Sequence, residues 1–208
     1  MNRHQHWENV HTVKPADQVS WFAPHLEVSL RFIDQLVLPT SASIIDIGSG
    51  QSTLPDDLLS RGYRNLTLLD ISPAALQVTR HRLGARAHSI QFLTADITTA
   101  TLPQAQYDLW HDRAVFHFLT TPEDRAAYRW QLTHALKPGG HVLLATFGPQ
   151  GPTRCSNLDV IRYDAPTLQH ELGSAFHLVE SATHLHQTPS GTTQQFLYLH
   201  FRFNAPRP

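Results

Sequence analysis

Residues 44–50, Ile44-Ile45-Asp46-Ile47-Gly48-Ser49-Gly50, decide the fold class of this chain. Isoleucines on both sides of a single acid predict a buried β-strand, and the two glycines predict a turn directly after it. Glycines in such a turn let a ligand approach the backbone, and open α/β sheets bind ligands at the carboxyl ends of their strands. The stretch therefore predicts a ligand-binding turn at the first strand of an α/β sheet.

The residues after this turn argue against a dinucleotide as the ligand. A dinucleotide-binding turn would carry a third glycine where Thr53 stands. The Asp46 carboxylate is unfavourable beside a pyrophosphate and favourable beside the ammonium group of an amino-acid moiety. Asp70 ends the second predicted strand about twenty residues after Gly50, the separation at which a βαβ unit presents an acid to ribose hydroxyls. Asp96 follows the third strand, where it can accept a hydrogen bond from an adenine amino group.

Short β-rich runs alternate with helical patterns from Ser43 onward, which is typical of a parallel sheet with crossover helices. Capping signals, such as Ser72-Pro73 at the start and Gly84 at the end of one helix, fix several helix boundaries. The C-terminal part changes character and predicts an antiparallel hairpin. The predicted strands are 43–47, 66–70, 90–94, 107–110 and 141–147, the predicted helices are 24–36, 73–84 and 121–136, and the hairpin strands are 177–186 and 194–203.

Composition limits the remaining possibilities. The 208 residues are 41% hydrophobic, enough for one α/β domain with a sizeable core, and the net charge of −1 gives no strong attraction to nucleic acid or anionic lipid. Cys155 is the only cysteine, so neither an internal disulfide nor a multi-cysteine metal cage is expected. The fifteen histidines are mostly scattered singly, so no metal site is predicted. Without an apolar leader or a long apolar run, a soluble, cytoplasmic protein is expected.

The motifs DIGSG, LLDIS, TADI, YDLW and LKPGGHVLLATF, in this order over residues 43–147, resemble the class I methyltransferase family that uses S-adenosylmethionine. The resemblance implies an α/β fold: a seven-stranded, mostly parallel, Rossmann-like sheet with an antiparallel C-terminal hairpin strand and helices on both faces. It implies S-adenosylmethionine as cofactor and S-adenosylhomocysteine as product. The cofactor contacts so predicted come from Asp46, Gly48, Ser49 and Gly50 for the methionine part, Asp70 and Ile71 for the ribose, and Asp96 and Ile97 for the adenine.

The flanking segments bear on the methyl acceptor. Strand four lacks the Asn/Asp-Pro-Pro-Tyr stretch that grips amide or base nitrogens. An early Trp7, then Trp21-Phe22, then Trp110-His111-Asp112-Arg113 resemble thiopurine and small-thiol methyltransferases, although the inserted His111 shifts the register of Arg113. Trp7, Trp21 and Phe22 are expected to cover the cofactor's sulfonium, because aromatic faces attract cations.

Further residues are candidates for the acceptor site. His111, Asp112 and Arg113 are the catalytic candidates, and the loop 148–156 is expected to wall the acceptor pocket. The residues predicted to contact the acceptor are Phe22, His117, Arg154, Cys155 and His184.

The chain is therefore predicted to be one domain that transfers a methyl group to a small soft nucleophile such as a thiol or sulfide. Residues 1–40 are expected to form a helical cover, 43–147 the cofactor-binding core, and 148–208 the acceptor loop, a helix and the hairpin. Two alternatives stay open, a protein-lysine methyltransferase and a non-catalytic cofactor-binding module. The expected partner is a small-molecule acceptor, with neither nucleic acid nor membrane, and the sequence predicts no oligomeric state.

Overall fold

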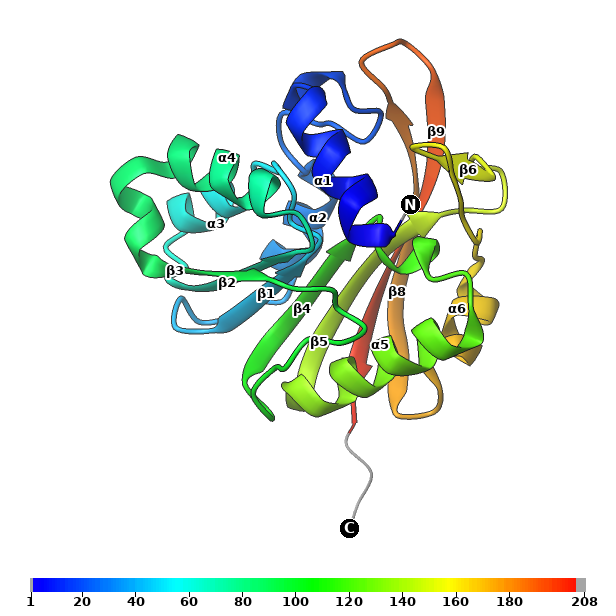
Figure 1. Ribbon diagram of the computed structural model, residues 1–208. Coiled ribbons are helices and arrows are strands. Elements are labelled where there is room, and N and C mark those ends of the chain that lie inside the picture. Colours follow the sequence, from blue (N-terminus) through cyan, green and yellow to red (C-terminus); the bar gives the residue numbers. More distant parts are fainter. Residues whose placement is uncertain (1, 205–208) are drawn as a thin grey trace.

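A seven-stranded sheet runs through the computed structural model, which describes residues 2–204 (Figure 1). The strand order is β3-β2-β1-β4-β5-β9-β8. These strands are β1 (Ser43–Ile47), β2 (Asn65–Asp70), β3 (Ile90–Thr94), β4 (Tyr107–Arg113), β5 (Leu136–Phe147), β8 (Phe176–Gln187) and β9 (Thr193–Phe203).

The chain reverses its direction of travel across the sheet between β1 and β4. β1 pairs in parallel with both β2 and β4, while β9 pairs antiparallel with β5 and with β8. The side chains and loops at the carboxyl ends of β1 and β4 therefore flank a topological switch point, where open α/β sheets hold their ligands. The predicted fold class, including the C-terminal hairpin, is confirmed.

Local signals set the ends of the crossover helices α4 (Pro73–Leu83) and α5 (Pro122–Ala135). The Ser72 hydroxyl accepts a hydrogen bond from the Ala75 N–H, and Thr121 accepts from Asp124 in the same way. Gly84 ends α4 in the left-handed region at φ 57°, which a residue with a Cβ atom rarely adopts. These are the boundaries that the sequence predicts.

The two faces of the sheet carry separate apolar cores. Because successive strand residues point to opposite faces, Ile44 packs under the helices α2 (Glu27–Gln35), α3 (Leu54–Ser60) and α4, whereas Ile45 packs under α5 and α6 (Ala165–Leu172). Leu109 and Trp110 divide in the same way. Helices thus cover both faces of the sheet, as Figure 1 shows.

Other elements were not predicted with these bounds. The remaining elements are α1 (Arg3–Val13), the 3-10 helices η1 (Ala16–Gln18), η2 (Gly84–Ser89) and η3 (Phe116–Phe118), and the short strands β6 (Arg154–Cys155) and β7 (Leu158–Asp159). The helix α3 was missed, and β4 and β5 extend beyond their predicted ends. α2 begins at Glu27, three residues after the expected start at Pro24.

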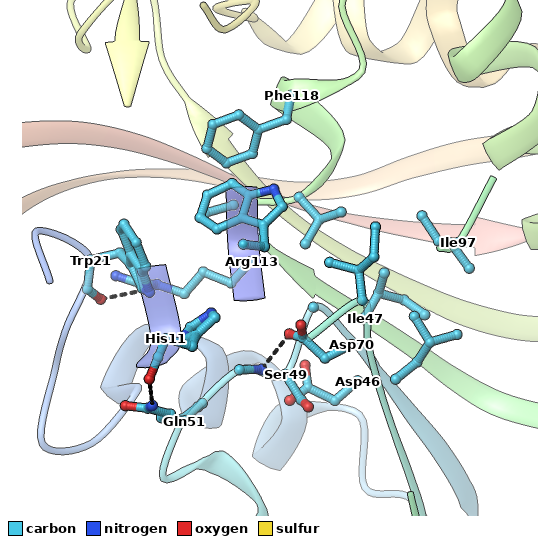
Figure 2. Close-up of a pocket in the computed structure, with 18 of the residues that line it drawn as sticks. His11, Trp21, Asp46, Ile47, Ser49, Gln51, Asp70, Ile97, Arg113 and Phe118 are labelled. Atoms are coloured by element: carbon cyan, nitrogen blue, oxygen red, sulfur yellow. Dashed lines mark hydrogen bonds between the residues drawn. The ribbon is translucent and has the colours of Figure 1, made fainter. Parts of the chain in front are cut away.

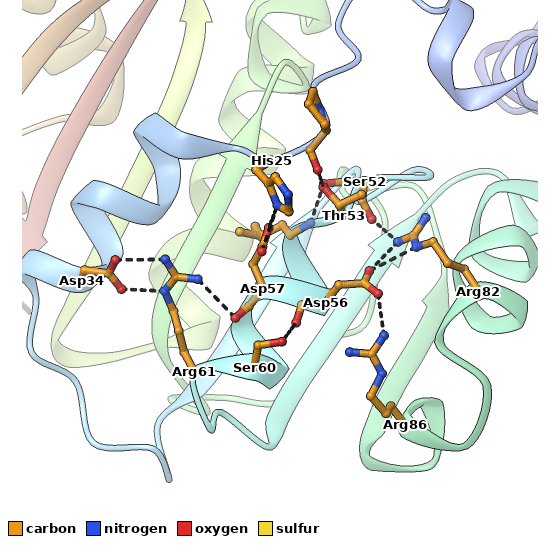
Figure 3. Close-up of polar contacts among 12 residues, drawn as sticks. His25, Asp34, Ser52, Thr53, Asp56, Asp57, Ser60, Arg61, Arg82 and Arg86 are labelled. Atoms are coloured by element: carbon orange, nitrogen blue, oxygen red, sulfur yellow. Dashed lines mark hydrogen bonds and ion pairs between the residues drawn. The ribbon is translucent and has the colours of Figure 1, made fainter.

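Ion pairs join α3 to α4 and η2, and hydrogen bonds from α4 hold the loop after the glycine turn (Figure 3). Asp56 on α3 binds both Arg82 and Arg86, with N···O distances of 2.9 and 2.8 Å. Arg82 also donates to the backbone oxygens of Gln51 and Ser52. The loop is therefore held on a rigid base, although each exposed pair by itself contributes little stability.

None of the helices within residues 2–204 has the length and apolar character needed to cross a membrane. Over the same residues, no group of three or more His, Cys, Asp and Glu side chains is arranged to hold a metal ion.

The free energy of unfolding is expected to fall as the pH drops from about 6.5 to 4. Burial lowers the pKa of His11 and of His141 to about 4, and burial together with Arg113 lowers that of His117 to about 3. Histidines in the unfolded chain titrate near pH 6.5, so the unfolded chain takes up protons at a higher pH than the folded chain does. Proton uptake therefore stabilises the unfolded chain, and the free energy of unfolding falls with the pH. The wholly buried His117 alone contributes about 1.4 kcal/mol per pH unit.

Urea unfolding at several pH values measures this slope. Burial raises the pKa values of Asp70 and Asp112 to about 6, so these two acids raise the free energy of unfolding as the pH falls below 6. The three histidines lower it over the same range, and their combined effect is larger. His117→Asn keeps an acceptor for the Phe147 N–H and should have a shallower slope. A free energy of unfolding that rises toward pH 4 would contradict the prediction.

Candidate functional site

A pocket opens at the carboxyl ends of β1, β2, β3 and β4, beneath α1 and the segment that follows it (Figure 2). Every residue predicted to contact the cofactor lines it: Trp7, Trp21, Asp46, Gly48, Ser49, Gly50, Asp70, Ile71, Asp96 and Ile97. Of the other candidates, Phe22, His111, Arg113 and Cys155 line it too. The fold therefore brings together residues from the N-terminal segment, four strands and the β6–β7 hairpin.

The glycine turn after β1 forms the floor of the pocket. Gly48 and Gly50 have φ values of 61° and 53°, and a Cβ atom on Gly48 would lie 2.1 Å from Val115 Cγ2. Gly48 is thus required both by its backbone conformation and by close packing. At Thr53, in place of a third glycine, the hydroxyl donates to the Pro24 carbonyl at 2.8 Å and ties the turn to the N-terminal segment.

Asp70, at the end of β2, is buried and braces the glycine turn. One carboxylate oxygen accepts from the Gly50 N–H and the other from the Ser72 N–H, both at 2.8 Å. Burial raises the pKa of this carboxyl group to about 6, so it is ionised at neutral pH. Each oxygen keeps a lone pair for a ligand hydroxyl.

Asp46, the acid of β1, is held by a neighbour on β4. The Nδ1 atom of His111 lies 2.6 Å from Asp46 Oδ1, and its Nε2 atom lies 2.9 Å from the Ser29 hydroxyl on α2. All three side chains are buried. His111 thus contacts the pocket at its edge, and both of its ring nitrogens are occupied.

Asp96, beyond β3, lies at the far end of the pocket beside Ile97. One of its oxygens accepts from the Thr98 N–H and hydroxyl, and Arg3 of α1 pairs with the other at 3.1 Å. Arg3 also pairs with Asp124 at the start of α5, at 2.6 Å. The first turn of α1 is therefore fixed to two elements on opposite sides of the pocket end.

α1 covers the pocket with an aromatic cluster. The Trp7 ring makes edge-on contacts with Trp21 and Phe118, with centroid distances of 5.8 and 4.9 Å. The next residue of α1, Glu8, accepts a hydrogen bond from the Ser72 hydroxyl at 2.6 Å and another from the Ala74 N–H at the start of α4. The cover is thus attached by polar contacts, and it presents the Trp7 and Trp21 rings to the pocket.

Arg113, the last residue of β4, brings a positive charge to the pocket wall. Its Nε donates to the Tyr198 hydroxyl at 3.0 Å and its Nη1 to the Trp21 carbonyl at 2.8 Å, while the guanidinium lies over the Phe196 ring. Within residues 2–204 it has no ion-pair partner. Its charge lowers the pKa of His184 and His186 in addition to the effect of burial.

Cys155 lines the pocket but is not activated. Burial raises the pKa of its thiol to about 11, although a hydrogen bond with Ser20 and the charge of Arg113 act the other way. A protonated thiol is a poor nucleophile, so Cys155 is a wall of the pocket.

Four predicted site residues do not line the pocket. Asp112 points to the opposite face of β4, where it accepts from the Tyr128 hydroxyl and from the Val115 and Phe116 N–H groups. His117 is wholly buried and accepts from the Phe147 N–H. Arg154 pairs with Asp159 on the β6–β7 hairpin, and His184 packs against the Tyr198 ring. These corrections remove all four from the candidate site.

Two buried polar atoms in the pocket have no hydrogen-bond partner in the described part of the chain, Ser49 Oγ and His11 Nδ1. Burial lowers the pKa of His11 to about 4, so its ring is neutral at pH 7. His11 was not predicted, although it stands one helical turn after Trp7 and therefore shares its face of α1. Buried polar groups are normally paired, so both atoms indicate a ligand with polar groups.

Residues 44–140 match the family model described as "Methyltransferase domain". The mouse protein "eEF1A lysine and N-terminal methyltransferase" is 25% identical over 138 residues, which cover 66% of this chain. The chain spans only 19% of that relative's length. A "Malonyl-[acyl-carrier protein] O-methyltransferase" of Halalkalibacterium halodurans is 33% identical over 111 residues, covering 51% of this chain and 40% of the relative.

Solved structures with the same fold cover nearly the whole chain. One, described as "Conversion of a Disulfide Bond into a Thioacetal Group during Echinomycin Biosynthesis", has a TM-score of 0.80 and 19% identity, and covers 99% of this chain and 95% of its own. The N-methyltransferase NodS of Bradyrhizobium japonicum, in complex with S-adenosylhomocysteine, has a TM-score of 0.69 and 20% identity, covering 95% and 98%. These similarities show the fold.

Proposed function

We propose that the chain is a class I S-adenosylmethionine-dependent methyltransferase, which its fold and the methyltransferase domain matched over residues 44–140 support, and that it methylates a small, soft nucleophile such as a thiol or sulfide. The observation that carries the proposal is the Arg113 guanidinium, which has no ion-pair partner within residues 2–204 and lines the same pocket as Trp7, Trp21, Phe118 and Cys155. Such a pocket suits an acceptor with an apolar body and a negative charge.

The pocket fits S-adenosylmethionine. Asp70 has lone pairs left for the ribose hydroxyls, and the unpartnered Ser49 hydroxyl lies in the turn that would hold the amino-acid part. Asp46 supplies a carboxylate for the ammonium group. Asp96 and Ile97 lie where an adenine would be bound by a hydrogen bond and by packing.

When bound, S-adenosylmethionine supplies a methyl group on a sulfonium, which is transferred by in-line displacement. The protein's part is to align the acceptor and to exclude water. Trp7 and Trp21 provide an apolar cover beside the reacting centre, and Arg113 favours the thiolate form of an acceptor by pairing with it. A thiolate acceptor would become a thioether, and the electron pair of the broken carbon–sulfur bond would stay on the cofactor's sulfur.

A protein-lysine substrate is the second candidate, favoured by the name of the mouse relative. A lysine side chain needs an open groove for the surrounding polypeptide, and its ammonium must lose a proton before it can react. The cover formed by α1 and the positive charge of Arg113 both oppose such a substrate. They support a small acceptor instead.

Turnover of labelled S-adenosylmethionine against thiols, sulfide, halides, small carboxylates and lysate proteins tests the proposal. Thiols or sulfide are expected to be the preferred acceptors. Labelling of one lysate protein, with thiols ignored, would contradict the small-acceptor assignment and favour the lysine candidate. A chain that binds the cofactor but methylates nothing in the panel would favour the non-catalytic alternative.

Arg113→Ala is expected to lower turnover of a thiolate or other anionic acceptor by about 10- to 150-fold, the value of a charged hydrogen bond worth about 1.5–3 kcal/mol. Cofactor affinity should change much less, because the guanidinium acts on the acceptor. Steady-state kinetics with calorimetry of S-adenosylhomocysteine binding measures both effects. Arg154→Ala, which removes an exposed arginine outside the pocket, is the matched control. An equal loss of turnover and cofactor affinity would contradict this role.

A further inference from the structure

A buried chain of three polar side chains connects α2, β4 and β1 behind the pocket. The Ser29 hydroxyl lies 2.9 Å from His111 Nε2, and His111 Nδ1 lies 2.6 Å from Asp46 Oδ1. The side chains come from residues far apart in the sequence, and the three residues are 0%, 1% and 4% exposed. Buried polar groups this close to one another act as a unit.

The proton positions follow from what each group can donate. An ionised carboxylate only accepts, so His111 Nδ1 carries a hydrogen and donates it to Asp46. A neutral ring then accepts the Ser29 hydroxyl hydrogen at Nε2, and both nitrogens are satisfied at once. The Ser29 hydroxyl is thus compatible with the ring form that Asp46 requires, because it can donate to Nε2.

Serine, histidine and aspartate serve as nucleophile, base and orienting acid in hydrolases, where the serine faces the substrate. In this protein the aspartate faces the pocket and the serine is buried. Ser29 is wholly buried on the sheet face of α2, where no acceptor can reach its oxygen. Asp46 is the member that lines the pocket. These three hydrogen-bonded side chains therefore orient the Asp46 carboxylate and do not activate Ser29.

One oxygen of Asp46 is left for a ligand. Oδ1 is taken by His111, and Oδ2 makes no hydrogen bond to any residue within the described range 2–204. A buried carboxylate that loses its partner tends to take up a proton or to turn toward another donor. His111 thus fixes the direction in which the free oxygen faces.

We infer that His111 and Ser29 are positioning residues, which hold Asp46 oriented to accept the ammonium group of the cofactor's amino-acid part. The inference rests on the proposed function, because it requires that S-adenosylmethionine occupy the pocket. It assigns His111 a role different from the catalytic one expected from sequence. Ser29 does not line the pocket, and both ring nitrogens of His111 are already occupied.

Calorimetry with two ligands tests the inference in the full-length chain. S-adenosylhomocysteine carries the ammonium group, whereas 5′-methylthioadenosine keeps the adenine and ribose but lacks the whole amino-acid part. His111→Leu is expected to weaken S-adenosylhomocysteine binding by at least about 10-fold and to leave 5′-methylthioadenosine binding within about twofold. His111→Asn can still donate to Asp46 and should recover most of the affinity.

Ser29→Ala provides a second variant, which keeps the imidazole and removes only the hydroxyl that orients it. It should also weaken S-adenosylhomocysteine binding selectively, by a smaller factor, and it remains informative if His111→Leu does not fold. Equal loss of both ligands, or no loss of either in a folded variant, would overturn the inference. A wild-type chain that binds neither ligand would instead overturn the proposed function on which the inference rests.

Discussion

Removal of residues 1–22 is expected to reduce methyl transfer by at least about 100-fold while the sheet stays folded. The truncation takes away Trp7 and Trp21, which cover the pocket, and the carbonyl that holds Arg113 Nη1. Water would then reach the reacting centre, and the acceptor would lose its alignment. The seven strands and the helices from α2 onward all lie outside the deleted segment.

Activity assays, circular dichroism and thermal unfolding measure the two effects side by side. Arg3→Ala and Glu8→Ala each remove one of the side chains that attach α1 and should give smaller, graded losses of activity. Val13→Ala, at an exposed position of the same helix, is the control and should leave turnover unchanged. Thiol methylation by the truncated chain at the full-length rate would refute the role of the cover.

Asp70→Ala is expected to weaken S-adenosylmethionine binding by about 5- to 150-fold, which corresponds to about 1–3 kcal/mol for lost hydrogen bonds to ribose hydroxyls. The loss has two sources. The hydroxyls lose their acceptor, and the Gly50 N–H loses the carboxylate that shapes the glycine turn. Calorimetry with a folded variant measures the effect.

The pH dependence of cofactor affinity distinguishes the contribution of Asp70 from those of other residues. Its pKa, raised to about 6 by burial, means that the carboxylate becomes protonated as the pH falls through that value. Cofactor affinity of the wild-type chain should therefore decrease below pH 6, whereas Asp70→Asn should bind weakly with little dependence on pH over the same range. Unchanged affinity in Asp70→Ala would remove the ribose assignment.

Local signals explain why the fold was predictable. Ser72, Pro73 and Gly84 fix the ends of α4 through a cap, a preset φ angle and a left-handed residue, each of which acts within a few positions of the chain. Asp46 and Gly48 mark the end of β1 in the same local way. The predicted cofactor residues from Asp46 to Ile97 line one pocket because they lie at the ends of strands that meet at one edge of the sheet.

The acceptor side was predicted less well, because it depends on which way side chains point. His111, Asp112 and Arg113 were grouped as neighbours in sequence, but β4 continues through all three. Alternate residues of a strand face opposite sides, so His111 and Arg113 reach the pocket while Asp112 enters the core. Had the strand been extended to Arg113, the alternation would have excluded Asp112.

Ser29 and His11 carried no local signal of their own. Each reaches the site through packing of a helix against residues far along the chain, and a serine or histidine on a helix has many ordinary explanations. The contact between Ser29 and His111 spans 82 positions, so no pattern within one element indicates it. Such pairs become visible only when the sheet and its helices are assembled.

The ion pair between Arg3 and Asp124 also determines when α1 can dock on α5 during synthesis on the ribosome. The two residues are 121 positions apart, so at a synthesis rate of about 5–20 residues per second the first helix waits roughly 6–24 seconds for its docking site. An isolated helix of this length is marginal in water. We therefore expect the contact between α1 and α5 to be absent from the nascent chain until α5 has emerged.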